Sequence, residues 1–182
     1  NDDLLFPAKV LVLRQEDVAR FAKPLFGASR ESDIERLLPA FDNAGIETRY
    51  SCVPIEWYGE PRGWAEKNRL YIENAVPLAA DAALESLARA GLEVSDVDTI
   101  VTVSTSGIAT PSLDALLVER LRMRRDVERM PIFGLGCAGG VLGLTRAATL
   151  ARAAPRSIVL FVVVELCGLT FRHADRSKSN VI

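Results

Sequence analysis

Cys137 lies in the most informative segment of this 182-residue chain, residues 133–140, which read Phe-Gly-Leu-Gly-Cys-Ala-Gly-Gly. An apolar stretch precedes the segment, and a stretch rich in small residues, predicted to be a helix, follows it. At a helix N-terminus, unpaired backbone amides and the helix dipole favour an anion, so a cysteine there is shifted toward its nucleophilic thiolate form. Cys137 is therefore a candidate acyl-accepting nucleophile. The alternative is that it is a small buried hydrophobic residue.

The glycines of the same segment allow a second interpretation. Gly134, Gly136 and Gly139 satisfy the G-x-G-x-x-G pattern of dinucleotide-binding turns, and Glu165 follows about one strand later, where a ribose-binding acid is expected. Any tight strand-to-helix turn with close packing needs the same glycines. The dinucleotide motif also usually belongs to the first βαβ unit of a domain, whereas most of this chain comes before it.

The chain has three cysteines, Cys52, Cys137 and Cys167. The number is odd and no C-x-x-C pair occurs, so the pattern favours neither a zinc site nor a dithiol centre, and we expect no metal. Reduced, intracellular thiols are the default expectation, and Cys52 and Cys167 are interpreted as structural residues.

Net charge and hydropathy argue against nucleic-acid binding and against a membrane span. The 22 Lys and Arg residues against 24 Asp and Glu residues give a net charge of −2, which is a poor match for nucleic acid. The longest apolar run, residues 158–164, is far shorter than the ~20 residues that a membrane span requires. No secretory signal pattern occurs near Asn1, and the last residues resemble the start of another element. We therefore expect a soluble, cytoplasmic protein that is part of a longer one.

The first half of the chain is predicted to be mainly helical. Apolar spacing predicts amphipathic helices over residues 15–26 and 32–41. Residues 45–64, rich in Pro, Gly and aromatic side chains, are predicted to be a long irregular segment, of the kind that often packs over a site. A long helix is predicted over residues 66–90, kinked near Pro77 and ended by a glycine.

Strands and helices alternate in the second half. Strands are predicted at residues 97–103, 131–134 and 157–164, and helices at 112–124 and 138–153. This alternation predicts βαβ units and a parallel sheet. The continuous apolar character of the last strand indicates burial on both faces. The expected fold class is a layered α/β fold, its sheet mostly parallel with helices on both faces.

Three segments, in this order and spacing, resemble a known family. They are residues 103–111 (Val-Ser-Thr-Ser-Gly-Ile-Ala-Thr-Pro), 134–140 (Gly-Leu-Gly-Cys-Ala-Gly-Gly) and 165–172 (Glu-Leu-Cys-Gly-Leu-Thr-Phe-Arg). The chain resembles the type III polyketide synthases, the chalcone and stilbene synthase family, in its bacterial form. The likeness extends from about Ile34 to the end.

This resemblance implies a thiolase fold of which residues 1–182 are the amino-terminal half. It implies that Cys137 accepts an acyl group from a CoA thioester starter and that malonyl-CoA extends it by decarboxylative Claisen condensation, with no further cofactor. It also implies a homodimer in which Thr110 reaches into the partner's site. The family positions that line the substrate cavity fall on Thr105, Ser106, Glu165, Cys167 and Thr170.

The family's catalytic His and Asn lie in a carboxy-terminal half outside these residues. His173, the only histidine, stands in a polar setting and is expected to be solvated. Two alternatives remain open: another thiolase-fold condensing enzyme, such as a ketoacyl-acyl-carrier-protein synthase, and a non-catalytic dinucleotide-binding module.

Overall fold

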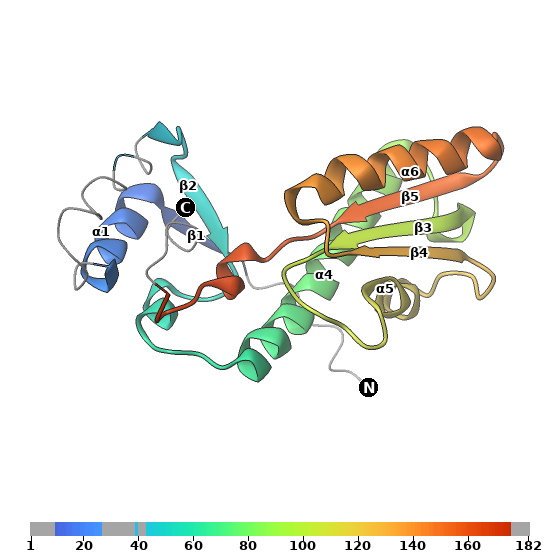
Figure 1. The fold of residues 1–182 in the computed structure, drawn as a ribbon. Helices are drawn as coiled ribbons and strands as arrows, with labels where there is room; N and C mark the ends of the chain where they lie inside the picture. Colours follow the sequence, from blue (N-terminus) through green and yellow to red (C-terminus); the bar gives the residue numbers. More distant parts are fainter. Residues whose placement is uncertain (1–9, 27–38, 40–42, 176–182) are drawn as a thin grey trace. The chain divides into compact units, whose positions relative to one another are not determined.

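The computed structural model of the chain describes residues 10–26, 39 and 43–175 (Figure 1). Within these residues the chain forms two compact units. The larger unit contains residues 68–166. The smaller unit contains the described residues before position 68 and after position 166, so its two chain segments come from far apart in the sequence.

A three-stranded parallel sheet is the core of the larger unit. Its strands are β3 (Val97–Ser104), β4 (Glu128–Phe133) and β5 (Ile158–Val163), in the order β4-β3-β5. All residues of β3 except the second are buried, because β3 pairs with a strand on each side. Its β-branched Val and Ile residues suit a strand that is packed on both faces.

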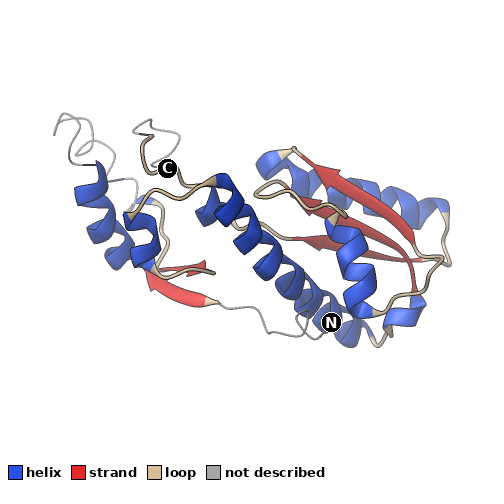
Figure 2. Cartoon of the chain, turned by 90° about the horizontal axis from the view of Figure 1, so that it is seen from below, coloured by secondary structure: helices blue, strands red, loops and turns tan. Residues whose placement is uncertain are grey.

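Helices cover both faces of this sheet. Helix α5 (Leu113–Leu121) lies on one face and α6 (Gly139–Ala153) on the other, as the two views in Figures 1 and 2 show. The long helix α4 (Trp64–Ala90) and the short η3 (Val94–Asp96) lead into β3. Helix α4 ends at Gly91, which has a φ of +68° and so provides a left-handed cap. None of the helices in the described part of the chain is both long and apolar enough to cross a membrane.

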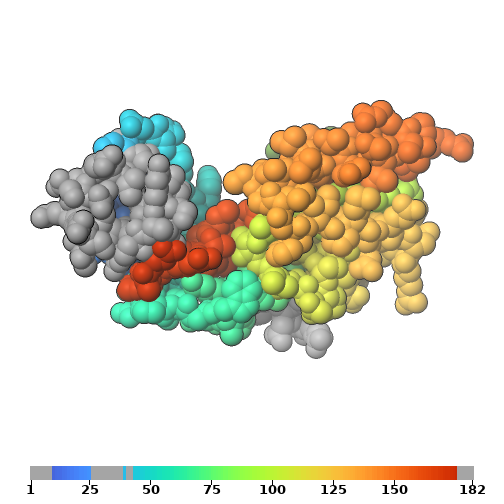
Figure 3. Space-filling view, viewed as in Figure 1, coloured from blue at the N-terminus to red at the C-terminus, as the bar shows by residue number. Residues whose placement is uncertain are grey.

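Helix α6 packs very closely against the sheet. A Cβ atom on Gly139 would lie 2.7 Å from Val103 Cγ1, and one on Gly143 would lie 2.6 Å from Phe161 Cε2. Because these glycines are four residues apart, they form one face of the helix. On the outer side, Val141 is 71% exposed, and α6 lies on the surface of its unit (Figure 3).

The smaller unit holds an antiparallel pair, β1 (Leu11–Arg14) and β2 (Thr48–Ser51), with helix α1 (Gln15–Phe26) and the short helices η2 (Ile55–Gly59) and η5 (Cys167–Thr170). Tyr58 joins its two chain segments. The Tyr58 hydroxyl hydrogen-bonds to Ser51, and the Tyr58 ring meets the ring of Phe171 edge to face. Lys67 also donates a hydrogen bond to the carbonyl of Phe171.

Most of the predicted elements are confirmed. The helix over residues 15–26 has the predicted bounds, and each predicted strand and helix of the larger unit is present with ends shifted by a few residues. The parallel sheet with helices on both faces is the expected fold class. The expectation that the last strand is buried on both faces does not hold for all of β5, which lies at the edge of the described sheet: Leu160 and Val162 are buried, but Val163 is 43% exposed.

Of the predictions for the first half, one needs correction and one concerns residues that the structure does not describe. Residues 45–64 are not wholly irregular, since they contain β2 and η2. The strand was not apparent because its Thr-Arg-Tyr-Ser sequence is polar and mostly exposed. The helix predicted over residues 32–41 falls, except for Pro39, outside the described residues.

Candidate functional site

The loops that follow the three parallel strands meet at one edge of the sheet, because parallel strands all end on the same side. The loop after β4 carries Cys137, in the one-turn helix η4 (Gly136–Ala138) that leads directly into α6. The Cys137 side chain is exposed. The predicted position of this thiol at a helix start is therefore the position observed.

Two glycines shape the turn that presents Cys137. Gly134 has a φ of +82° and Gly136 a φ of +54°, in the left-handed region that favours glycine. The chain then enters α6 through Ala138, whose side chain offers no hydrogen-bond acceptor. The N–H of Gly139, the first residue of α6, donates to the carbonyl of Gly136, so η4 and α6 form one continuous helical segment that begins at Gly136. The N-terminal end of a helical segment favours negative charge.

Thr105, in the loop after β3, contacts this turn. The backbone N–H of Gly136 donates a hydrogen bond of 3.2 Å to Thr105 Oγ1. This bond joins the loop after β3 to the residue immediately before Cys137.

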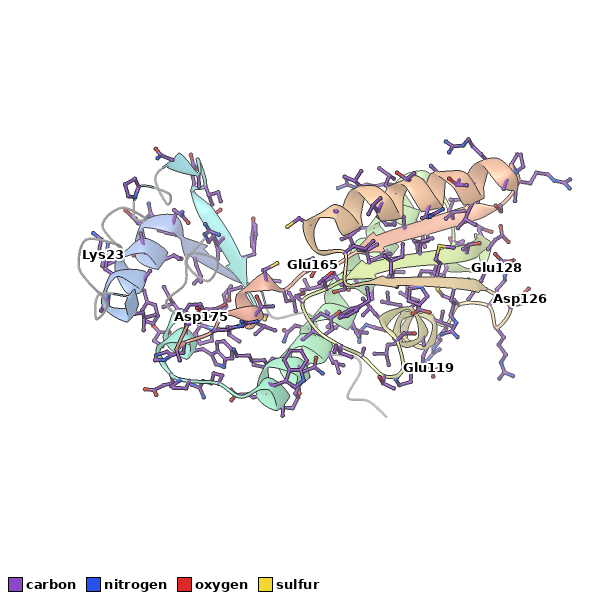
Figure 4. All side chains as sticks on the ribbon, viewed as in Figure 1. Lys23, Glu119, Asp126, Glu128, Glu165 and Asp175 are labelled. Atoms are coloured by element: carbon purple, nitrogen blue, oxygen red, sulfur yellow. The ribbon has the colours of Figure 1, made fainter. Side chains whose placement is uncertain are left out.

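Ser106 joins the loop after β3 to the loop after β5. Its backbone N–H donates to Glu165 Oε2 at 2.9 Å, and its Oγ accepts a hydrogen bond of 2.7 Å from the N–H of Leu166. Ser106 is buried, whereas Glu165 is exposed just past the end of β5 (Figure 4). These two hydrogen bonds, between Ser106 and residues 165–166, join the two loops and are called the clip below.

The larger unit thus brings together Thr105, Ser106 and Glu165 with the turn that carries Cys137. Thr110 lies in the same unit, exposed in the loop before α5, where the Thr110–Pro111 peptide bond is cis.

The other two predicted cavity residues belong to the smaller unit. Cys167 and Thr170 are both exposed on η5, where Thr170 Oγ1 donates to the Cys167 carbonyl. Gly168 between them lies against the Tyr58 hydroxyl, where a side chain would not fit.

A buried polar pair, which the sequence did not indicate, supports the base of the loop after β3. The Tyr71 hydroxyl of α4 donates to Ser104 Oγ at 2.7 Å, and both side chains are buried. Burial raises the pKa of Tyr71 more than this hydrogen bond lowers it. The Tyr71 ring also lies against Gly107, where a Cβ atom would clash with it. No local pattern marks such a pair, because its members are 33 residues apart.

A pocket of about 150 Å³ lies in the larger unit, with Tyr71, Ile108, Leu113 and Phe133 among its lining residues. Its lining does not include Cys137 or any of the residues that clip the loops together. The pocket therefore adjoins the base of the loop after β3, through Tyr71, Ser104 and Gly107, but does not contain the turn that carries Cys137.

Cys52 and His173 are weaker candidates for catalysis than Cys137. Cys52 is half-buried, and burial raises the pKa of its thiol, which disfavours the reactive thiolate. His173 is partly exposed in the smaller unit. Within residues 10–26, 39 and 43–175, no three His, Cys, Asp or Glu side chains gather as metal ligands.

Comparison with known proteins identifies a family and several relatives of this chain. Residues 57–181 match the family described as chalcone and stilbene synthases, N-terminal domain. The chain is 41% identical over 175 residues to the "Putative chalcone synthase" of Bacillus subtilis (strain 168), covering 93% of this chain and 48% of that protein. It is 39% identical over 140 residues to the 1,3,6,8-tetrahydroxynaphthalene synthase of Streptomyces peucetius subsp. caesius, covering 77% of this chain and 37% of that enzyme.

Among solved structures, the 1,3,6,8-tetrahydroxynaphthalene synthase of Streptomyces coelicolor A3(2), a bacterial type III polyketide synthase, superposes with a TM-score of 0.86 at 27% identity. The match covers 95% of this chain and 50% of that one. The chain therefore spans half or less of the length of these relatives.

Proposed function

The chain belongs to the chalcone and stilbene synthase family, and on that premise we propose that it is the amino-terminal half of a type III polyketide synthase with Cys137 as its nucleophile. The observation that supports this most directly is the exposed thiol of Cys137 on a glycine turn at the start of α6. A buried cysteine in the same sequence would have favoured a structural role.

The proposed reaction begins at this thiol. The Cys137 thiolate attacks the carbonyl carbon of an acyl-CoA, a new thioester bond forms at sulfur, and CoA leaves as its thiolate. Malonyl-CoA then loses CO₂, and the resulting carbanion attacks the acyl-enzyme carbonyl, which returns the sulfur of Cys137 as the leaving group. The substrates are CoA thioesters, and the proposal includes no further cofactor.

The surrounding residues have proposed roles that follow from their places. Ser106 and Glu165 hold two loops at the sheet edge and would shape the substrate cavity. Thr105 is proposed to line the same cavity, Cys167 and Thr170 are proposed to be substrate-binding residues, and Thr110 is proposed to reach into the site of the partner subunit in a cytoplasmic homodimer. The exposed position of Thr110 in its loop is compatible with that last role.

Peptide mapping after alkylation tests the assignment of the nucleophile. Limiting iodoacetamide at mildly alkaline pH should label Cys137 first, Cys167 second and Cys52 last, because Cys137 lies exposed in η4, directly before the N-terminus of α6, and Cys52 is half-buried. Equal labelling of all three would remove the assignment.

A parallel titration addresses the dinucleotide interpretation of the same glycines. The positive φ angles of Gly134 and Gly136 and the packing of Gly139 on Val103 account for all three glycines without a bound pyrophosphate. NADH fluorescence should therefore not change when the chain is added. Binding at micromolar NADH, with Cys137 no more reactive than the other thiols, would favour a dinucleotide module instead.

A further inference from the structure

The turn that carries Cys137 is built from residues with unusual backbone freedom. Gly134 and Gly136 both adopt left-handed φ angles, and no side chain on either residue restricts the turn. Glycine has more accessible backbone conformations than any other residue. Contacts from outside the turn are needed to select the conformation that places Cys137 at the start of α6.

Thr105 supplies such a contact, through the hydrogen bond that Thr105 Oγ1 accepts from the Gly136 N–H. Gly136 is the first residue of η4 and immediately precedes Cys137, so this hydrogen bond holds the peptide group at which the helical segment carrying Cys137 begins.

Thr105 is itself held between two anchored neighbours. On one side, Ser104 ends the buried strand β3 and hydrogen-bonds to Tyr71. On the other side, Ser106 is clipped to Glu165 and to the backbone of Leu166. A rigid base therefore presents the Thr105 hydroxyl to a conformationally free turn, which is the arrangement that a positioning residue requires.

We infer that Thr105 is a positioning residue for the nucleophile: its hydroxyl holds the Gly136 N–H and so fixes the turn that places Cys137 in η4, at the start of the helical segment that continues as α6. The inference rests on the proposed function in taking Cys137 as the nucleophile. It adds a role for Thr105 that is independent of any contact with substrate, and it predicts an effect on Cys137 before any substrate binds.

Removal of the hydroxyl at constant side-chain shape tests this role. Thr105→Val should slow alkylation of Cys137 by iodoacetamide roughly two- to tenfold, the range expected when one ordinary hydrogen bond no longer biases a local equilibrium. Thr105→Ser retains the acceptor oxygen and should restore a rate close to that of the wild type. Alkylation of Cys167, which lies outside the turn, provides the internal reference in every sample.

Thr149→Val is the matched control. Thr149 is exposed on α6, and its hydroxyl donates to the carbonyl of Thr145 within the same helix. The chemical change is the same as in Thr105→Val, but the turn is not involved, so the Cys137 rate should stay at the wild-type value. Circular dichroism of each variant confirms that the fold is retained.

Amide exchange provides a readout that does not depend on thiol chemistry. The chain has 12 glycines, so selective ¹⁵N-glycine labelling gives a simple spectrum in which the Gly136 amide is followed directly. Thr105→Val should accelerate exchange of the Gly136 N–H by a similar factor, and Thr105→Ser should not.

The outcomes separate the inference from the proposed function. If wild-type Cys137 is alkylated no faster than Cys167, the proposed function fails first. If wild-type Cys137 reacts fastest and Thr105→Val leaves both its rate and the Gly136 exchange unchanged, the positioning role is wrong while the nucleophile stands. If the valine and serine variants lose reactivity equally in a retained fold, the hydrogen bond is not the cause, and the inference is also overturned.

Discussion

The backbone amide of Ser106 donates a hydrogen bond of 2.9 Å to the Glu165 carboxylate, although 59 residues separate the two in the chain. Glu165→Ala leaves this amide without its acceptor and should lower the free energy of unfolding by about 1 kcal/mol. Glu165→Gln keeps an acceptor oxygen and should cost less than the alanine variant. Urea denaturation of the three proteins measures the difference.

Glu119→Ala is the control for this substitution. Glu119 is an exposed carboxylate on α5, and its loss should change the unfolding free energy by no more than about 0.5 kcal/mol. An effect of Glu165→Ala no larger than that of Glu119→Ala would show that the clip does not stabilise the unit.

The face of α6 that contacts the sheet gives the second prediction. Gly143→Ala places a methyl group against Phe161 and Val103 and should destabilise the chain by about 1–3 kcal/mol through overpacking. Gly140→Ala, three residues earlier on a side with open space, should stabilise it by about 0.5–1 kcal/mol, since alanine loses less backbone entropy in a helix. Thermal or urea unfolding of the two variants measures both changes. Changes in unfolding free energy of the same sign would contradict the packing described for α6.

Asp98 gives a pH-dependent prediction. Its carboxylate accepts hydrogen bonds from the Ile158 N–H at 2.8 Å and from Arg124 at 2.9 Å. The Ile158 amide, followed by Arg124, lowers the pKa of Asp98 below its ordinary value of 3.8. Because the folded-state pKa is the lower one, the charged carboxylate stabilises the fold above pH 3.8, and this contribution is lost as the pH falls through the folded-state pKa.

Asp98→Asn should therefore be less stable than the wild type at neutral pH, and the gap in urea midpoint should close as the pH falls below 3.8. The exposed Asp81 on α4 provides the comparison, because Asp81→Asn should shift the midpoint little at any pH. A gap for Asp98→Asn that stays constant down to the acid limit would contradict the charge-based account.

Much of the fold could be predicted from the sequence, because strong periodicity and composition mark individual elements. The apolar positions Val18, Phe21 and Leu25 predict α1, and the β-branched residues of β3 predict a strand. β1 was not predicted because it has only four residues. The predicted strand at residues 131–134 missed the start of β4 because Glu128 and Arg129, with which β4 begins, are polar and exposed. Short or exposed strands depend on their partners in the sheet, which local sequence does not identify.

The candidate site was predictable only in part, for a related physical reason. The place of Cys137 at a helix start follows from local glycine and helix signals. The bonds of Thr105 to Gly136 and of Ser106 to Glu165 join loops that are distant in sequence, and serine and threonine hydroxyls have many local partners open to them. These particular pairs form because the folded sheet brings the ends of its parallel strands to one edge.

The fourth prediction concerns the condensation step. An acyl transfer site needs preorganised donors for the developing oxyanion, and losing one such donor commonly costs ~10²–10³ in rate. The resemblance to type III polyketide synthases assigns these donors to a His and an Asn beyond this chain. Residues 1–182 alone should therefore not release CO₂ from radiolabelled malonyl-CoA above background, and co-expression with a carboxy-terminal half from a relative should restore release. Robust CO₂ release by the chain alone would show that a complete catalytic set lies within it.

The most direct test of the central claim is intact-mass analysis of the chain after incubation with hexanoyl-CoA, followed by peptide mapping. If Cys137 is the acyl acceptor, one hexanoyl group should add to the chain, map to the peptide that contains Cys137, and disappear in Cys137→Ala while Cys167→Ala retains it. An adduct that survives in Cys137→Ala, or that distributes evenly over Cys52, Cys137 and Cys167, would contradict the account.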